Sequence, residues 1–326
     1  MKNIYKYQAI LVIIMICGYS SAQDIHFSQF DASPIIINPS YTGMYTESDF
    51  RATNQYRSQW DALARKSYLS SILTYDMPFQ EKWGLGAYII NDNSARVYNS
   101  FSFVLSGAHD IIIDDQERHK LSVGIQLGVI YKSTRLEDFL FDNQYSSGRF
   151  NEDLPTGEVF EKNARLMPET NIGVSYQNVE NSKMFNPYGG ISVFHILNPK
   201  ENLTAADDSR LPLKFVLHGG SKISINDKIT LDPKFLLMKQ RNAYEIVIGA
   251  GSVFQIKDTD FNILGGINYR WNDAVITTVG LYYKNFIYRV SYDFNVSKLR
   301  EFSSYKGGLE FSLVFLKLTR SSQRLL

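Results

Sequence analysis

Apolar residues alternate with small or polar residues along most of this chain. The clearest case is "LSVGIQLGVIY", residues 121–131, in which every second residue is apolar and the residues between them, up to position 128, are Ser, Gly and Gln. Such alternation is typical of a β-strand with two different faces. Similar segments lie at residues 244–254, 261–270, 286–294 and 308–316. The pattern therefore predicts an all-β protein.

The predicted strands number about fourteen and are about ten residues long, the length that a tilted strand needs to cross a bilayer. The face opposite the apolar residues is mostly Gly, Ser, Thr and Asn, which suits the interior of a closed barrel better than the surface of a soluble β-sandwich. We therefore expect a transmembrane antiparallel β-barrel over residues 50–326. Its strands begin near residues 50, 67, 83, 98, 119, 169, 186, 213, 229, 242, 261, 274, 286 and 305.

The spacing of the strands predicts which loops face outside. If the amino terminus starts in the periplasm, loops after odd-numbered strands lie outside and should be the long ones. The three longest gaps, 132–168, 198–212 and 295–304, all follow odd-numbered strands, whereas the tight turns at 226–228 and 284–285 follow even-numbered ones. An even strand count is therefore expected. Loop 132–168 is long enough to cover a site or bind a partner, with a disordered surface loop as the alternative.

The amino terminus resembles a secretory signal. Two lysines precede an apolar run at residues 9–17, and the small residues that a signal peptidase needs follow at 20–22. The run is about half of the roughly 20 residues of a spanning helix, which argues against a membrane anchor. We expect a signal peptide in residues 1–22, cleaved after Ala22, and an outer-membrane location. Cleavage also removes Cys17, the only cysteine, so no disulfide supports the mature chain.

Composition and motifs narrow the function further. Lys and Arg (34) balance Asp and Glu (33), which leaves no net field to attract nucleic acid. The 21 Tyr and 21 Phe fit the aromatic girdles of a membrane barrel. The five histidines are scattered, without an HExxH pair, a GxSxG elbow or a Gly-rich phosphate loop. We therefore expect no catalytic, metal or cofactor site and no enzyme, although an outer-membrane hydrolase stays open as an alternative.

Residues 23–49 do not alternate and form a separate irregular segment. Pro34 and Pro39 each lack an amide donor and bias the preceding residue away from helix. Irregular backbone is tolerated at membrane depth only inside a protein wall, so we expect residues 23–43 to enter or underlie the barrel from the periplasmic side as a plug. A periplasmic tail that binds a partner is the alternative. The residues assigned to this plug or partner segment are Phe27, Ser28, Gln29, Ile35, Ile36, Ile37, Asn38, Pro39, Tyr41 and Gly43.

Alternation also places charged residues on the inward faces of the first and last strands. Barrel closure brings these strands together, and charges in a narrow or plugged lumen need neutralising partners. We expect the charges to hold the seam and to dock the amino-terminal segment, the alternative being separate solvated charges in a wet lumen. The seam charges are Arg51, Arg57, Arg289, Asp293 and Glu310.

Five stretches together resemble the PorP/SprF family of membrane proteins in Bacteroidetes. The residues of the family motifs include Trp60, Tyr292 and Ser297. The last stretch also resembles the carboxy-terminal signal by which outer-membrane barrels are recognised for insertion. The stretches are "FSQF" (27–30), "NPSYTG" (38–43), "RSQW" (57–60), "YDFNVSKL" (292–299) and "GGLEFSLVF" (307–315).

The resemblance implies an outer-membrane barrel of the type IX secretion system, which exports gliding adhesins and other large cargo. Members of the family pair with particular cargo, whose carboxy-terminal domains they help to export or to retain at the surface, and one branch belongs to the core machine with its periplasmic ring lipoproteins. The expected partners are thus a secreted cargo protein, the ring lipoproteins and the lipid bilayer, with no nucleic acid and no cofactor. A plugged outer-membrane channel for small or hydrophobic solutes is the alternative.

Overall fold

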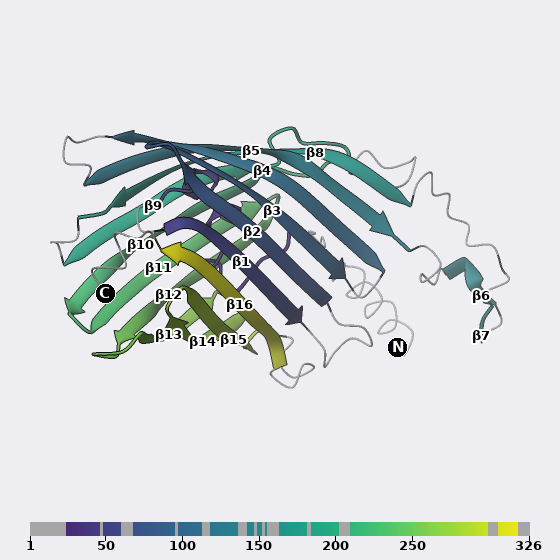
Figure 1. Cartoon of the computed structure of the whole chain (residues 1–326). Coiled ribbons are helices and arrows are strands. Elements are labelled where there is room, and N and C mark those ends of the chain that lie inside the picture. Colours follow the sequence, from purple (N-terminus) through teal and green to yellow (C-terminus); the bar gives the residue numbers. More distant parts are fainter. Residues whose placement is uncertain are drawn as a thin grey trace.

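The structure is a computed structural model in which fourteen strands form one closed antiparallel barrel (Figure 1). Neighbours in the barrel are neighbours in the sequence, and the first strand pairs with the last to close the wall. The prediction of an all-β barrel of about fourteen strands is confirmed. The residues that the structure describes are 24–45, 48–59, 68–94, 97–112, 118–135, 142–146, 149–151, 154, 163–180, 184–201, 209–298 and 306–318.

The strands start close to the predicted positions. The largest difference is at β8, which begins at residue 164 because its pairing with β5 continues through Pro168, although proline donates no ladder hydrogen bond. The barrel strands are β1 (Ser48–Gln59), β2 (Tyr68–Phe79), β3 (Trp83–Ser94), β4 (Tyr98–Ile112), β5 (His119–Thr134), β8 (Ala164–Asn178), β9 (Phe185–Phe194), β10 (Lys214–Asn226), β11 (Ile229–Gln240), β12 (Ala243–Gln255), β13 (Phe261–Arg270), β14 (Ala274–Tyr283), β15 (Phe286–Asn295) and β16 (Lys306–Leu318).

The loop between β5 and β8 contains the remaining short elements. It spans residues 135–163, so it is shorter than the predicted 132–168. The short strands pair with each other and not with the barrel, and Figure 1 places them well away from the barrel wall. These elements are η4 (Asp142–Gln144), β6 (Tyr145–Ser146) and β7 (Arg149–Phe150).

The two faces of each strand differ as the alternation predicts. On β5, Leu127 is 55% exposed on the outer face while its neighbour Gln126 is fully buried in the lumen. Most of the large exposed apolar side chains alternate in this way, and they form the surface that lipid would contact. No helix among the described residues is long and apolar enough to cross a membrane.

The two ends of the barrel have different connections. At one end, here called the long-loop end, lie the loops 135–163, 195–213 and 296–305. The other, the short-turn end, carries turns such as 227–228 and 284–285. Ser48 at the start of β1 pairs with Leu318 at the end of β16, so the barrel begins and ends at the short-turn end.

Residues 24–45 lie inside the barrel and are called the inner segment. Asp24 contacts Gln240 at the long-loop end, and Gly43 donates its backbone N–H to Asp76 near the short-turn end. The inner segment thus crosses the lumen from the long-loop end to the short-turn end, where it leads into β1. In place of an extended chain, the segment forms two 3-10 turns, η1 (Pro34–Ile36) and η2 (Pro39–Tyr41), each with proline at its first position.

The inner segment packs against the wall through three buried apolar residues. Ile35 is fully buried against Tyr88 and Val104, whereas Phe30 and Ile37 join a cluster on the opposite wall. The wall residues of that second cluster are Phe194, Val216, Leu236 and Val247. The lumen of this barrel therefore contains an apolar core, and not only the polar side chains that usually line such barrels.

Candidate functional site

Glu310 on β16 anchors the inner segment by accepting two consecutive backbone N–H groups. The N–H of Ser28 donates to its Oε2 at 2.8 Å, and the N–H of Gln29 donates to its Oε1 at 2.9 Å. The Gln29 side chain donates to Ser291 Oγ and accepts from Ser312 Oγ. Because hydrogen bonds to an ionised carboxylate are stronger than neutral ones, this anchor fixes the segment against β15 and β16.

The hydroxyl of Ser28 lies in a buried cluster of four charges. Ser28 Oγ donates to Asp293 Oδ1 at 2.7 Å and accepts from Arg270 Nη2 at 2.8 Å and from Arg57. Arg57 pairs with Asp293 at 2.9 Å and with Glu310 at 3.2 Å, and Arg270 pairs with Asp293 at 3.1 Å. All four charged side chains are at most 3% exposed, and Arg270 also pairs with Glu245 at 3.4 Å and with Asp273 at 3.0 Å. We call Arg57, Arg270, Asp293 and Glu310 the Ser28 charge cluster.

The five charges predicted for the seam all face the lumen, but only three of them meet. Arg57, Asp293 and Glu310 lie together, with Arg57 directly opposite Glu310 in the register of β1 and β16. Arg51 instead donates to Asp76, at 2.9 and 2.7 Å, nearer the short-turn end. Arg289 instead pairs with Asp31 of the inner segment at 3.0 Å.

Sequence reasoning missed Arg270. The alternation of apolar and polar residues in "FNILGGINYR", the β13 stretch, already indicates that Arg270 faces the lumen. Its partnership with Ser28, 242 positions away in the chain, depends on the course of the inner segment across the lumen.

The stretch "NPSYTG" forms a tight turn against the wall. The Asn38 side chain donates to the carbonyls of Val174 (3.0 Å) and Ile191 (3.2 Å), and its oxygen accepts from Ser40 N–H at 3.0 Å. The hydroxyl oxygen of Thr42 is hydrogen-bonded to Ser106 Oγ, with 2.5 Å between the two oxygens. These contacts fix the turn to β4, β8 and β9, on the side of the lumen opposite the Ser28 charge cluster.

Glycines in the wall make this close approach possible. A Cβ atom at Gly173 would lie 2.0 Å from Asn38 Oδ1, and one at Gly124 would lie 2.3 Å from the carbonyl carbon of Pro39. A Cβ at Gly84 would lie 1.8 Å from the carbonyl oxygen of Thr42. Real Cβ atoms do not approach so closely, so each of these positions requires glycine while the inner segment is in place.

The remaining residues singled out from the sequence have simpler surroundings. Phe27 is buried at the lumen, and the Tyr41 ring lies 5.2 Å from the His218 ring. Tyr292 packs edge-on against Phe294 on the outer face of β15. Ser297 donates its backbone N–H to Asn295 Oδ1 at 2.9 Å in the turn after β15. Trp60 lies outside the described residues.

A second anchor holds the start of the inner segment at the long-loop end. His195, directly after β9, contacts Asp24 at 2.5 Å through Nε2 and Glu169 at 2.7 Å through Nδ1. Lys214 pairs with Asp24 at 3.1 Å, and the Asp24 N–H donates to Gln240 Oε1 at 2.8 Å. Burial lowers the pKa of His195, but Asp24 and Glu169 raise it more, to about 9. No sequence pattern indicated this cluster, because its members are isolated in the chain.

The part of the chain that the structure describes has no group of three or more His, Cys, Asp or Glu side chains placed to hold a metal ion. The contacts of His195 are therefore those of a hydrogen-bonded ion pair. Their effect is to fix the first residues of the inner segment at the mouth of the barrel.

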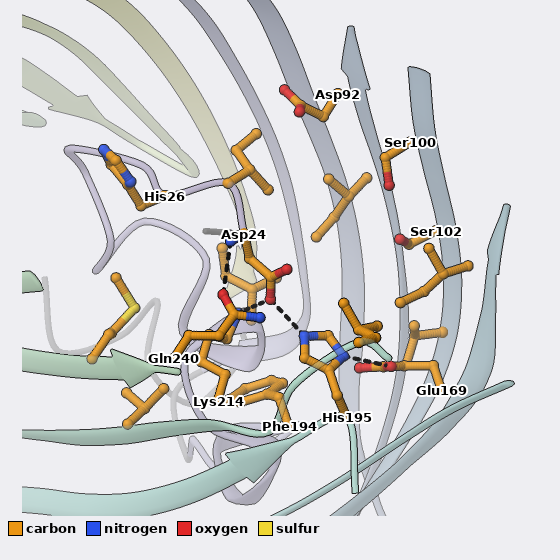
Figure 2. Close-up of a pocket in the computed structure, with 18 of the residues that line it drawn as sticks. Asp24, His26, Asp92, Ser100, Ser102, Glu169, Phe194, His195, Lys214 and Gln240 are labelled. Atoms are coloured by element: carbon orange, nitrogen blue, oxygen red, sulfur yellow. Dashed lines mark hydrogen bonds and ion pairs between the residues drawn. The ribbon is translucent and has the colours of Figure 1, made fainter. Parts of the chain in front are cut away.

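A cavity of about 550 Å³ lies between the inner segment and the wall (Figure 2). Phe30, Ile36 and Ile37 of the inner segment form part of its lining. Apolar residues of the wall complete the part of the lining that is farther from the long-loop end. Toward the long-loop end the lining becomes polar, and Asp24, Lys214, Gln240 and His195 are among the lining residues labelled in Figure 2. A cavity with this lining could hold a small molecule that is largely apolar.

The closed wall and the apolar outer band define a β-barrel of the outer-membrane type. The inner segment of the same chain occupies its lumen. The model of the family "Type IX secretion system membrane protein PorP/SprF" matches residues 19–315. The chain therefore belongs to the PorP/SprF family, as the five stretches of sequence indicate. No curated protein matches this sequence.

Solved structures that resemble the chain are also membrane barrels, and the likeness concerns the fold alone. The toluene transporter TbuX of Ralstonia pickettii matches with a TM-score of 0.50 and 10% identity, over 89% of this chain and 94% of that one. The monoaromatic hydrocarbon channel CymD matches with a TM-score of 0.49 and 12% identity, over 93% and 95%. A FadL homologue of Pseudomonas aeruginosa matches with a TM-score of 0.45 and 10% identity, over 85% and 92%.

Proposed function

We propose that this protein is a non-enzymatic outer-membrane component of the type IX secretion system that helps to export a partner cargo protein, such as a gliding adhesin, or to retain it at the cell surface. The protein engages the carboxy-terminal domain of that partner. Its signal peptide is cleaved after Ala22, and its long-loop end faces outside. Periplasmic ring lipoproteins would contact the short-turn end.

Family membership supports the link to type IX secretion. The observation that carries the rest of the proposal is the occupied lumen. The inner segment is hydrogen-bonded to the carboxylate of Glu310 on one side and to the carbonyl of Val174 on the other, and leaving buried groups of this kind without a partner is costly. A barrel filled in this way has no room for a folded domain to pass. In this proposal the inner segment acts as a plug, and the cargo domain docks at one end of the barrel.

The test is to purify the protein from native outer membrane through a tag within loop 135–163 and to identify the associated proteins by mass spectrometry. We expect to recover a large secreted protein attached through its carboxy-terminal domain. The same tag in an unrelated barrel of the same membrane controls for nonspecific recovery.

A deletion strain then decides whether the association matters for secretion. Loss of the cargo from the cell surface on deletion, and its return on complementation, would support the proposal. Normal surface display of the recovered cargo in the deletion strain would contradict it.

A channel for small or hydrophobic solutes is the second candidate, and the apolar cavity in the lumen favours it. If the protein is such a channel, the purified barrel alone should carry solute across a lipid bilayer. Solute flux into vesicles containing only this protein, together with normal cargo display in the deletion strain, would favour the channel over the secretion component.

A further inference from the structure

The cavity in the lumen has two zones that repeat on four strands, β3, β5, β10 and β11. On each strand, the lining residue nearer the long-loop end is polar, and the lining residue two positions deeper is apolar. Residues two apart on a strand point to the same face, so both zones face the same cavity. The polar residues, here called the collar, are Asp92, Lys132, Lys214 and Gln240, together with Ser100 and Ser102 of β4, where the apolar residue Val104 follows one step deeper. The apolar residues, here called the base, are Ile90, Val104, Ile130, Val216 and Met238.

The base is unusual for the interior of a membrane barrel. Such interiors are ordinarily polar and wet. Here Val104, Ile130 and Val216 are each at most 5% exposed, and Ile36 and Ile37 of the inner segment line the same cavity. The one carboxylate of the lining at this depth, Glu169, is buried and paired with His195 at 2.7 Å. An apolar cavity holds water poorly and instead binds apolar guests. The volume of about 550 Å³ lies within the range of small-molecule sites.

The two lysines of the collar already have partners, and Asp92 accepts a hydrogen bond from Ser70 at 2.6 Å. Lys132 is paired with Glu201, and Lys214 is paired with Asp24 at 3.1 Å. A ligand with an anionic head would have to compete with these carboxylates. Hydroxyl and amide groups are also present, since Ser100, Ser102 and Gln240 line the cavity as well. These groups suit a head that is uncharged and forms hydrogen bonds.

We propose that this cavity is a binding site for an amphiphile with a single alkyl or acyl chain and an uncharged polar head, such as a fatty alcohol or a monoacylglycerol. The chain occupies the apolar base above the inner segment, and the head lies in the collar at the long-loop end. This inference goes beyond the proposed role in secretion and does not depend on it.

The test uses the full mature protein in nanodiscs, after purification in a detergent without an alkyl chain so that detergent does not fill the site. The probe is a long-chain fatty alcohol that carries a diazirine on its chain. After irradiation, mass spectrometry maps the labelled residues. We expect labels on residues of the base as well as on residues that face lipid, because the probe also dissolves in the bilayer.

Two neighbouring residues on β10 provide a matched pair of variants. Val216 faces the cavity and is 3% exposed, whereas Leu217 faces lipid and is 42% exposed. Val216→Trp should abolish labelling of the base, while Leu217→Trp should leave it unchanged. Label on the lipid-facing residues should persist in both variants. Heat-modifiable migration in gel electrophoresis verifies that each barrel is folded.

Competition in the unaltered protein gives a second readout that needs no variant. Excess unlabelled dodecanol should remove the label from the base but not from the lipid-facing residues, whereas dodecanoate should compete poorly. Label confined to the lipid-facing residues, or label on the base that dodecanol does not displace, would overturn the proposal. Equal competition by dodecanoate would overturn the assignment of an uncharged head.

Discussion

Arg57 and Glu310 face each other across the seam that closes the barrel, with Arg57 Nη1 3.2 Å from Glu310 Oε2. Both are fixed further by the inner segment, because Ser28 bonds to each of them. The contact that joins the first strand to the last is therefore also the contact that holds the amino-terminal segment in the lumen. Closure of the wall and filling of the lumen are thus linked through one cluster of side chains.

Replacement of Arg57 should destabilise the barrel strongly. Arg57→Ala leaves Asp293 and Glu310 buried with one cation fewer, and loss of one partner from a buried ion pair costs about 3–5 kcal/mol. We expect the free energy of unfolding in urea, measured in lipid vesicles, to fall by about this amount.

Lys317→Ala is the matched control, because it removes an exposed cation on β16. Lys317 lies 3.6 Å from Asp49 with side chains 56% and 45% exposed, and such surface pairs contribute about 0–1 kcal/mol. If both substitutions lowered the free energy of unfolding equally, the Ser28 charge cluster would contribute no more to stability than a surface ion pair.

Substitution of Gly173 should displace the inner segment while the wall remains closed. In Gly173→Val the side chain would overlap Asn38, whose Oδ1 lies 2.0 Å from the Cβ position. The mature chain has no cysteine of its own if the signal peptide is removed, so Ala32→Cys can report the displacement. Ala32 is 2% exposed, and we expect its thiol to react with maleimide only when Gly173→Val is also present.

Gly107→Val is the control for this test. A Cβ at Gly107 has only one neighbour within 4 Å, the Gly84 carbonyl oxygen at 3.9 Å, so this substitution should leave Ala32→Cys protected. A thiol that stays protected beside Gly173→Val would contradict the assigned packing of the "NPSYTG" turn.

The contact of His195 with Asp24 should depend on pH. The folded pKa of His195, about 9, lies above its ordinary value of 6.5, so the stability it contributes is fully present below about 6.5 and is lost as the pH rises through about 9. The groups around it are Glu169 and Lys214 on the wall, with Lys132 and Glu201 beside Asp24 at the mouth.

Urea unfolding at about pH 6 and about pH 10 checks this expectation. The unaltered protein should lose more stability over this interval than His195→Gln, in which the titrating group is absent. Lysines and tyrosines titrate equally in both proteins, so the difference between the two losses of stability reports on His195 alone. An identical loss in both would mean that folding does not raise the pKa of His195.

The course of the inner segment predicts on which side of the membrane its first residues lie, given that the long-loop end faces outside as proposed. Asp24 lies at the long-loop end, whereas the last residue of β16 lies at the short-turn end. A peptide tag inserted directly after Asp24 should therefore bind antibody on intact cells. A tag after Leu326 should bind only after the outer membrane is permeabilised. The reverse result would contradict either the course of the segment or the orientation of the barrel.

The sequence was sufficient to predict the wall. Strand alternation depends on neighbouring residues, so the lumen faces of Arg57 and Gln126 could be assigned before any tertiary contact was known. The two prolines likewise showed that the chain before β1 is neither a regular strand nor a long helix. Their 3-10 turns were not anticipated, because the cap that Asn38 provides for Ser40 becomes stable only against the wall.

The partners within the lumen were decided by the tertiary structure. Arg57 and Asp293 are 236 positions apart, and they meet because barrel closure and register bring β1 beside β16 and near β15. The same alternation that gave Arg51 and Arg289 an inward face could not say that they would pair with Asp76 and Asp31 instead. The cavity could not be predicted from local sequence patterns either, since its base combines the inner segment with five strands. Local geometry decides which way a side chain points, but only the closed barrel and the path of the chain through it decide what it meets.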